Sequence, residues 1–334
     1  MIRTDRIIAA TFVVLVSTAI VGMSTGDTGA SFTGTTTNPS QILQTSTVAA
    51  PASESAASAI AGRVDLSWPA TTTPANGHTV TYLVLRNGVQ VGTTAALTYS
   101  DTPPADGTYT YTVETKIAQG AGFFTSVASP AQSPKSDRTA PMMSATCNGG
   151  SCAGWFNGNV TFVVSGNDGA GVGMGTATTN VDAAGAVTSA APRTVTVNGE
   201  SATHSVVYSG ADAVGNAAGN TSQTVKIDLT APTAATSVTA AKGGSAGQIT
   251  VSWIAGTDAL SGVSGYTIHG SGVVASCPAT TPANYPNTTT VGAVTSATIS
   301  GLVSASKYCF YLTTTDNAGN VSATSAAAGP QPAK

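Results

Sequence analysis

Four aspartates offer the clearest capacity for chemistry in this sequence, because they occur as two similarly spaced pairs. Asp168 and Asp258 each lie in a turn that ends in Gly-Val, and Asp212 and Asp316 each open a DxxGN turn. If both turns of a pair lie at one end of a β-sandwich, the carboxylates can converge on calcium, which takes six to eight oxygen ligands. The same aspartates can also cap their own turns without metal. The sequence favours capping, and calcium is the alternative.

Residues 243–247, Gly-Gly-Ser-Ala-Gly, match the nucleophile elbow of serine hydrolases letter for letter. That elbow needs its serine on a tight turn from a strand into a helix. Here the motif joins two predicted strands, which favours a hairpin loop. The three glutamates, Glu54, Glu114 and Glu200, lie in different regions and form no evident pair for glycoside hydrolysis. We therefore predict no catalytic residue and no enzyme activity.

The four cysteines favour two local disulfides, Cys147–Cys152 and Cys277–Cys309, the simplest of the three connectivities that four cysteines allow. By chain entropy, the second bond closes a loop of about 33 residues and contributes about 4 kcal/mol. Zinc is disfavoured, because none of the three histidines lies at finger spacing from a cysteine pair. The histidines are expected to be structural or surface residues.

Composition excludes several classes of partner. Charged residues make up 8% of the chain and the net charge is −3, so no basic surface is available for nucleic acid or for anionic lipid. Hydrophobic residues reach 41% but aromatic residues only 6%, so the cores must consist mainly of aliphatic side chains. Thin β-sandwiches suit that supply.

The N-terminus has the pattern of an export signal. Arg3 and Arg6 precede an uncharged apolar run from Ile7 to Met23, and small residues lead up to Ala30. We expect residues 1–30 to be a signal peptide cleaved after Ala30, and the mature protein to be extracellular or at the cell surface. The run has about 17 residues, so an uncleaved membrane anchor is the alternative. Residues 31–60 follow as a linker rich in Ser, Thr and Ala.

Two near copies of one motif divide the rest of the chain. Residues 135–141 and 226–232 both read Lys-x-Asp-x-Thr-Ala-Pro and lie about 90 residues apart, close to the length of one sandwich domain. Because proline cannot donate to a strand ladder, each copy is expected to be a joint between domains. The sequence predicts an all-β chain of three tandem sandwiches, at residues 61–134, 138–230 and 233–334.

The first and last of these segments resemble fibronectin type III modules. Each has a tryptophan on its second strand, a tyrosine on its third and a tyrosine at the start of its sixth: Trp68, Tyr82 and Tyr109, then Trp253, Tyr266 and Tyr308. In such modules the last tyrosine bonds back to the preceding loop. The last segment has roughly 15 additional residues between its third and sixth strands, which we expect Cys277–Cys309 to hold in place.

The middle segment resembles the Ig-like repeats of bacterial surface proteins, through a Gly-Trp opening at Trp155 and a DxxGN ending at Asp212. One tryptophan per segment suggests three separate cores. Residues 30–39 resemble the mature start of camelysin-like proteins and of bacterial biofilm-fibre subunits.

These features favour a non-catalytic exported bacterial protein that acts as a spacer, surface or adhesion module, with a protein or a glycan at the cell surface as partner. A carbohydrate-binding or accessory protein of a secreted polysaccharide-degrading system is the first alternative. A subunit of an extracellular fibre is the second. No cofactor other than calcium is expected.

Overall fold

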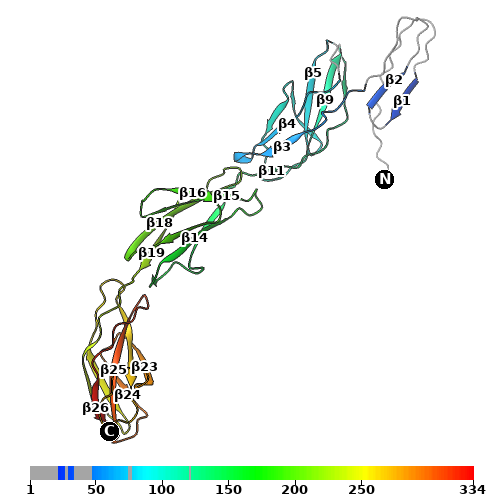
Figure 1. Ribbon diagram of the computed structural model, residues 1–334. Helices are drawn as coiled ribbons and strands as arrows, with labels where there is room; N and C mark the ends of the chain where they lie inside the picture. Colours follow the sequence, from blue (N-terminus) through cyan, green and yellow to red (C-terminus); the bar gives the residue numbers. More distant parts are fainter. Residues whose placement is uncertain (1–21, 27–28, 34–46, 74–76, 120–121) are drawn as a thin grey trace, which may run out of the picture. The chain divides into compact units, whose positions relative to one another are not determined.

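The computed structural model describes residues 22–26, 29–33, 47–73, 77–119 and 122–334, and these residues form an all-β structure (Figure 1). Their one helical segment is a 3-10 turn, η1 (Ile60–Gly62). No helix in this part of the chain is long and apolar enough to cross a bilayer. The expected signal peptide lies outside the described residues, except where it enters the hairpin of β1 (Gly22–Gly26) and β2 (Gly29–Thr33).

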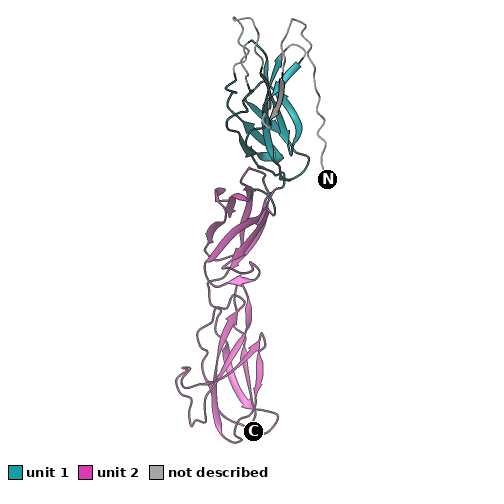
Figure 2. Ribbon diagram, turned by 90° about the vertical axis from the view of Figure 1, so that its right-hand side faces the viewer, with its two compact units in different colours: residues 1–139, 170–172 teal, residues 140–169, 173–334 magenta. Residues whose placement is uncertain are grey.

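The chain divides into two compact units, drawn in different colours in Figure 2. Unit 1 comprises Met1–Thr139 with Ala170–Val172, and unit 2 comprises Ala140–Gly169 with Gly173–Lys334. Unit 1 contains one sandwich, here called the first sandwich. Unit 2 contains two, here called the middle and last sandwiches, and each packs its own apolar core.

The first sandwich pairs a four-stranded sheet, in the order β10-β9-β5-β6, with a three-stranded sheet, β3-β4-β7. Its Asn87-Gly88 turn joins β5 to β6 with both residues at positive φ, as a tight hairpin requires. Its strands are β3 (Ser55–Ser58), β4 (Val64–Ser67), β5 (Val80–Arg86), β6 (Val89–Thr94), β7 (Thr98–Asp101), β8 (Gly107–Thr108), β9 (Tyr111–Gln119), β10 (Gly122–Thr125) and β11 (Lys135–Ser136).

Alternation along these strands builds the core. Val64 and Leu66 on β4 are buried while Asp65 between them is half-buried, and Trp68 follows directly. Trp68 and Tyr82 pack with ring centroids 5.6 Å apart. The hydroxyl of Tyr109 donates to the carbonyl of Ala105 at 3.0 Å, the backward bond that the fibronectin resemblance implies.

The middle sandwich stacks a three-stranded sheet, β12-β14-β17, on a five-stranded sheet, β13-β19-β18-β15-β16, in which β13 and β19 run parallel. Its strands are β12 (Met142–Cys147), β13 (Trp155–Phe156), β14 (Val160–Asn167), β15 (Met174–Val181), β16 (Val187–Ala190), β17 (Arg193–Val197), β18 (Ser201–Asp212) and β19 (Thr221–Ile227).

The aromatic residues of this core differ from the expectation of one tryptophan per core. Phe162 and Tyr208 are buried and pack at 5.8 Å, whereas Trp155 is half-buried on the edge strand β13, with Lys226 over its ring. Its neighbour Phe156 packs on the core, and because successive strand residues face opposite sides, Trp155 faces away from it. The Cys147–Cys152 disulfide closes the turn after β12 and joins the same core.

The last sandwich pairs β20-β21-β24 with β23-β22-β25-β26. Trp253 and Tyr266 pack with ring centroids 5.2 Å apart and an angle of 60° between the rings, the same angle as between Trp68 and Tyr82 in the first sandwich. Its strands are β20 (Thr236–Lys242), β21 (Ile249–Ile254), β22 (Val263–Gly270), β23 (Asn287–Gly292), β24 (Ser296–Ile299), β25 (Lys307–Asp316) and β26 (Ala328–Pro332).

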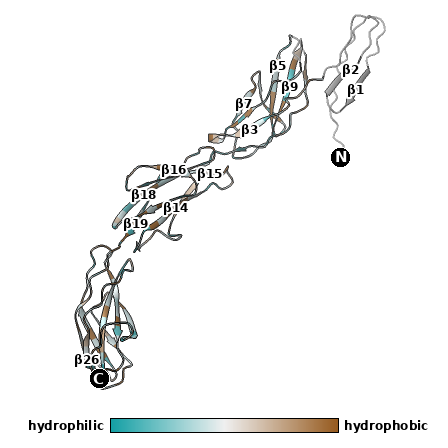
Figure 3. Ribbon diagram, in the orientation of Figure 1, coloured by the Kyte–Doolittle hydropathy of each residue, from teal (hydrophilic) through white to brown (hydrophobic). Residues whose placement is uncertain are grey.

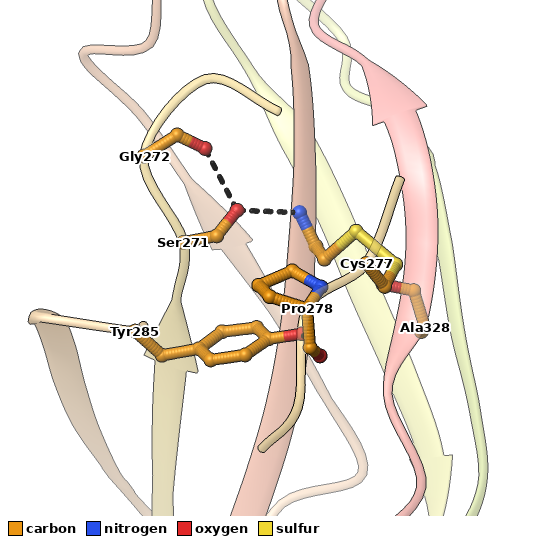
Figure 4. Close-up of a disulfide and its surroundings, with 7 residues drawn as sticks. Ser271, Gly272, Cys277, Pro278, Tyr285 and Ala328 are labelled. Atoms are coloured by element: carbon orange, nitrogen blue, oxygen red, sulfur yellow. Dashed lines mark hydrogen bonds between the residues drawn. A yellow bond between two sulfur atoms is a disulfide. The ribbon is translucent and has the colours of Figure 1, made fainter. Parts of the chain in front are cut away.

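The additional residues of the last sandwich lie between β22 and β23 and form a second, small core. Cys277 is bonded to Cys309 on β25 (Figure 4). Tyr285 packs edge to face on Tyr311, with ring centroids 4.8 Å apart. The Tyr285 hydroxyl donates to the carbonyl of Pro278 at 3.1 Å. The disulfide does hold this segment, as expected, but the segment also buries apolar surface of its own, because Tyr285 is completely buried.

Strand β25 serves both cores because its side chains alternate. Tyr308, Phe310 and Leu312 enter the main core, whereas Cys309 and Tyr311 face the inserted segment. Figure 3 shows the same mixing of apolar and polar residues along the strands, in place of long continuous apolar segments. Both faces of β25 are thus covered.

Candidate functional site

Asp316, at the end of β25, organises the turn that follows it. Its Oδ1 accepts the backbone N–H groups of Ala318, Gly319 and Asn320 at 2.7 to 2.9 Å. Its Oδ2 accepts the side-chain amide of Asn320 at 2.8 Å. Because this carboxylate is almost completely buried, these four donors replace the water that it loses.

Asp212, at the end of β18 in the middle sandwich, has the same arrangement. Its Oδ1 accepts the N–H groups of Val214, Gly215 and Asn216 at 2.6 to 2.9 Å, and its Oδ2 accepts the Asn216 amide at 2.6 Å. The DxxGN motif is thus a self-capped turn in both sandwiches. This is the role that the sequence favours.

The partner aspartates also cap turns. Asp258 accepts the N–H groups of Leu260 and Gly262 through Oδ1, at 3.0 and 2.7 Å. Asp168 accepts the N–H of Gly173 through Oδ2 at 2.7 Å. Each expected pair does come together, because one carboxylate oxygen of Asp168 lies within 4.8 Å of one of Asp212, and the same holds for Asp258 and Asp316.

A third carboxylate, which sequence reasoning did not assign to a site, joins Asp258 and Asp316. Asp228 directly follows β19, is completely buried, and places an oxygen within 4.8 Å of the other two. Its Oδ1 accepts the N–H of Thr230 at 3.1 Å and its Oδ2 accepts the N–H of Ser261 at 3.0 Å. We name the set of Asp228, Asp258 and Asp316 the joint carboxylates.

The repeated motif at the two joints already indicated a structural role for Asp228. Both copies of Lys-x-Asp-x-Thr-Ala-Pro keep the aspartate, and Asp137 in unit 1 likewise accepts an N–H two residues on, from Thr139, at 3.0 Å. Capping explains the local pattern, but the sequence contains nothing that reveals how Asp228 approaches Asp258 and Asp316, which lie at least 30 residues away.

Polar contacts hold the joint carboxylates in place. The amide of Asn320 donates to the backbone carbonyl of Asp228 at 2.9 Å as well as to Asp316. Burial raises the pKa of the Asp228 carboxyl, but hydrogen bonding, including the N–H groups of Ser261 and Thr230, outweighs that effect and lowers the pKa below its ordinary value. Asp228 is therefore a carboxylate at neutral pH.

The residues considered for catalysis do not assemble. Ser245 is exposed in the hairpin loop between β20 and β21, and β21 begins at Ile249 without an intervening helix. Glu54 bonds to Ser129, whereas Glu200 bonds to Thr230. The elbow motif is therefore a hairpin, as its position between predicted strands indicated.

His204 on β18 makes the one histidine ion pair of the described residues. Its Nδ1 lies 2.7 Å from Asp182 Oδ2, and its Nε2 lies 3.0 Å from the carbonyl of Gly199. Burial alone would lower the pKa of His204, but these two acceptors raise it by more than burial lowers it. The pKa is therefore above its ordinary value. This is a structural role.

Comparison with known proteins gives one relative in sequence and more distant likenesses in structure. No family model matches the chain. Exoglucanase B of Cellulomonas fimi is 31% identical over 278 residues, which are 78% of this chain but 23% of that enzyme, so the chain spans about a quarter of its relative.

Among solved structures, the FN1–FN3 domains of chicken CNTN1 match 84% of this chain and 98% of theirs, at 16% identity and a TM-score of 0.40. Domains A168–A170 of titin match 81% and 93%, at 13% identity and a TM-score of 0.38. At these scores the assignment of β-sandwiches rests on the sheets and cores described above.

Proposed function

We propose that this chain is a non-catalytic, exported spacer in a polysaccharide-degrading system. The observation that carries the proposal is the similarity over 278 residues to part of an exoglucanase. The three sandwiches support it, because each packs its own apolar core, and the carboxylates that come together at their turns are occupied in capping those turns.

Export is part of the same proposal. The chain begins with the pattern of a signal peptide, and all four cysteines are in disulfides, which persist in oxidising compartments. We propose an extracellular or cell-surface location. N-terminal sequencing of the fractionated mature protein tests it, because cleavage near Ser31 is expected, and an intact Met1 in a membrane fraction would replace cleavage with anchoring.

A spacer should affect a solid substrate and not a dissolved one. We would insert residues 47–334 between a cellulase domain and a cellulose-binding domain, and compare this fusion with a direct fusion of the two. Faster release of sugar from crystalline cellulose, with equal rates on a soluble glucan, is expected. Equal rates on both substrates would contradict the spacer role, and sugar release by this chain alone would contradict its being non-catalytic.

Glycan binding is the second candidate, and one feature favours it. Phe123 and Phe124 on the edge strand β10 are exposed, with Lys116 Nζ 4.2 Å from the Phe123 ring centroid. Exposed rings can stack on sugars. Retention of the wild type on cellulose, lost in Phe123→Ala but kept in Val127→Ala, would favour this candidate over the spacer.

A further inference from the structure

The joint carboxylates are an unusual arrangement for a region without a paired cation. Two of the three, Asp228 and Asp316, are almost completely buried, and all three oxygens lie within 4.8 Å of one another. The four ion pairs of the described residues involve Arg63, Arg86, Arg138 and His204, and none includes a joint carboxylate. Buried like charges at this separation repel unless a cation lies between them.

The hydrogen bonds leave oxygen capacity facing the group. A carboxylate oxygen has two lone-pair sites. Asp316 Oδ1 is saturated by three N–H donors, but its Oδ2 accepts one, and Asp258 uses only Oδ1 in the described bonds. Asp228 accepts one donor at each oxygen. Every joint carboxylate therefore keeps a site for a further partner.

Ser261 supplies an independent observation. Its side chain is more than nine-tenths buried and its Oγ has no hydrogen-bond partner of regular geometry in this part of the chain. Ser261 lies beside the joint carboxylates, because its own N–H donates to Asp228 Oδ2 at 3.0 Å and the N–H groups of its neighbours Leu260 and Gly262 donate to Asp258. A buried hydroxyl without a partner is costly, and a ligand at this position would satisfy it.

We propose that Asp228, Asp258, Asp316 and Ser261 bind one calcium ion. Oxygens held at 2.3 to 2.6 Å from one ion lie at most about 5 Å apart, so a group within 4.8 Å of one another fits a shared ion. Carboxylate and hydroxyl oxygens are hard ligands of the kind that calcium takes, and water completes its six to eight positions. The ion joins the segment after β19 to the loops that follow β21 and β25.

The variant Asp258→Asn tests the contribution of the Asp258 charge to ion binding separately from its role as a cap. An asparagine keeps an Oδ1 that caps Leu260 and Gly262, so the turn is retained while one ligand charge is lost. Ser261→Ala removes the hydroxyl but keeps the N–H that binds Asp228. Asp65→Asn, on the first sandwich, is the matched control.

Calcium chloride titration of the chelator-treated full chain, followed by calorimetry, measures the number of ions and their Kd. We expect the wild type to bind at a Kd of about 0.1 to 1 mM, as extracellular modules do. Asp258→Asn should bind one calcium fewer per chain, and Ser261→Ala should raise the Kd of that site roughly tenfold. The control should match the wild type.

Thermal unfolding gives the second readout. Saturating calcium should raise the unfolding temperature of the wild type and of Asp65→Asn, and raise that of Asp258→Asn less, because a ligand stabilises only a state that binds it. Two results would overturn the proposal. One is a wild type without calcium binding up to about 10 mM; the other is an Asp258→Asn that keeps wild-type stoichiometry and affinity.

Discussion

The first and last sandwiches have similar cores but differ at one edge. Both pack a tryptophan on a tyrosine of the neighbouring sheet, with ring centroids 5.6 Å apart in the first and 5.2 Å in the last. Only the last inserts a segment between β22 and β23, with its own disulfide and buried Tyr285. The comparison teaches that the tryptophan–tyrosine contact defines the module, whereas the loops between strands can acquire a second core without disturbing it.

A second shared feature is the serine clasp. We define it as the two serines in each of these sandwiches whose hydroxyls accept backbone N–H groups of β9 or of β25. In the first sandwich, Ser129 and Ser126 accept the N–H groups of Val113 and Thr115, each at 2.9 Å. In the last sandwich, Ser325 and Ser322 accept those of Leu312 and Thr314 at 2.9 and 2.8 Å. The difference lies beyond the clasp, because Ser129 also donates to the buried Glu54 whereas Ser325 donates to its neighbouring carbonyl.

The largest expected effect is loss of the shared core contact. Trp68→Ala and Trp253→Ala should each destabilise their own sandwich by about 3 to 5 kcal/mol, because both side chains are buried in a close-packed interior. Hydrogen exchange resolved by peptide measures each sandwich separately. Loss of protection in the other sandwich would show that the cores are coupled, against the domain division that we propose.

The next largest loss of stability is expected when the disulfide of the inserted segment is removed. Cys277→Ser with Cys309→Ser should destabilise the last sandwich by about 2 to 4 kcal/mol, somewhat less than chain entropy alone predicts if Tyr285 keeps the reduced loop partly ordered. The same exchange protocol measures it. Removal of Cys147 and Cys152, which close a shorter loop, is the control and should cost less; an equal cost would mean that loop length does not decide the effect.

Removal of a serine of the clasp should destabilise the two sandwiches to different extents. Ser325→Ala leaves one buried N–H unsatisfied and should cost about 1 to 3 kcal/mol. Ser129→Ala should cost more at neutral pH, because Glu54 loses its hydrogen-bond donor as well. Urea unfolding of the full chain, with exchange used to locate the loss, measures both. Equal costs would show that the bond from Ser129 to Glu54 does not contribute to the stability of the first sandwich.

The smallest expected effect concerns pH. Burial raises the pKa of Glu54, although its bond to Ser129 opposes the shift. The folded chain therefore binds this proton more tightly than the unfolded chain, so the stabilisation is present below the ordinary pKa and is lost as pH rises through the raised one. Glu54→Gln should remove this loss and stabilise the first sandwich at pH 7. Thermal unfolding from pH 4 to 8 tests it, and an unchanged pH profile would contradict it.

Prediction from sequence succeeded where the signal is local. Alternating residues located the strands around Trp68 and Trp253, and the two disulfide pairs that the structure contains are those that proximity favoured. The tyrosine corner at Tyr109 followed from a family resemblance.

Prediction failed where a role depends on distant neighbours. Trp155 is a residue type that is usually found in a core, but its position on an edge strand leaves it half-buried. Tyr285 sits in a proline-rich segment, and only the fold brings Tyr311 to it. Asp228 was identified as part of a joint, yet its approach to Asp258 and Asp316 is a tertiary event that no spacing rule encodes.

The serine clasp has a consequence for self-association. An exposed sheet edge invites strands of other molecules, because its unpaired N–H and C=O groups form a template. In both clasped sandwiches these groups are engaged, since Ser129 and Ser325 not only accept an N–H but also donate their own to the carbonyls of Val113 and Leu312 at 2.9 Å. A polymer built by donating a strand to either edge would first have to displace the clasp. The clasp thus leaves these stretches of β9 and β25 without free backbone groups for a strand of another copy to pair with.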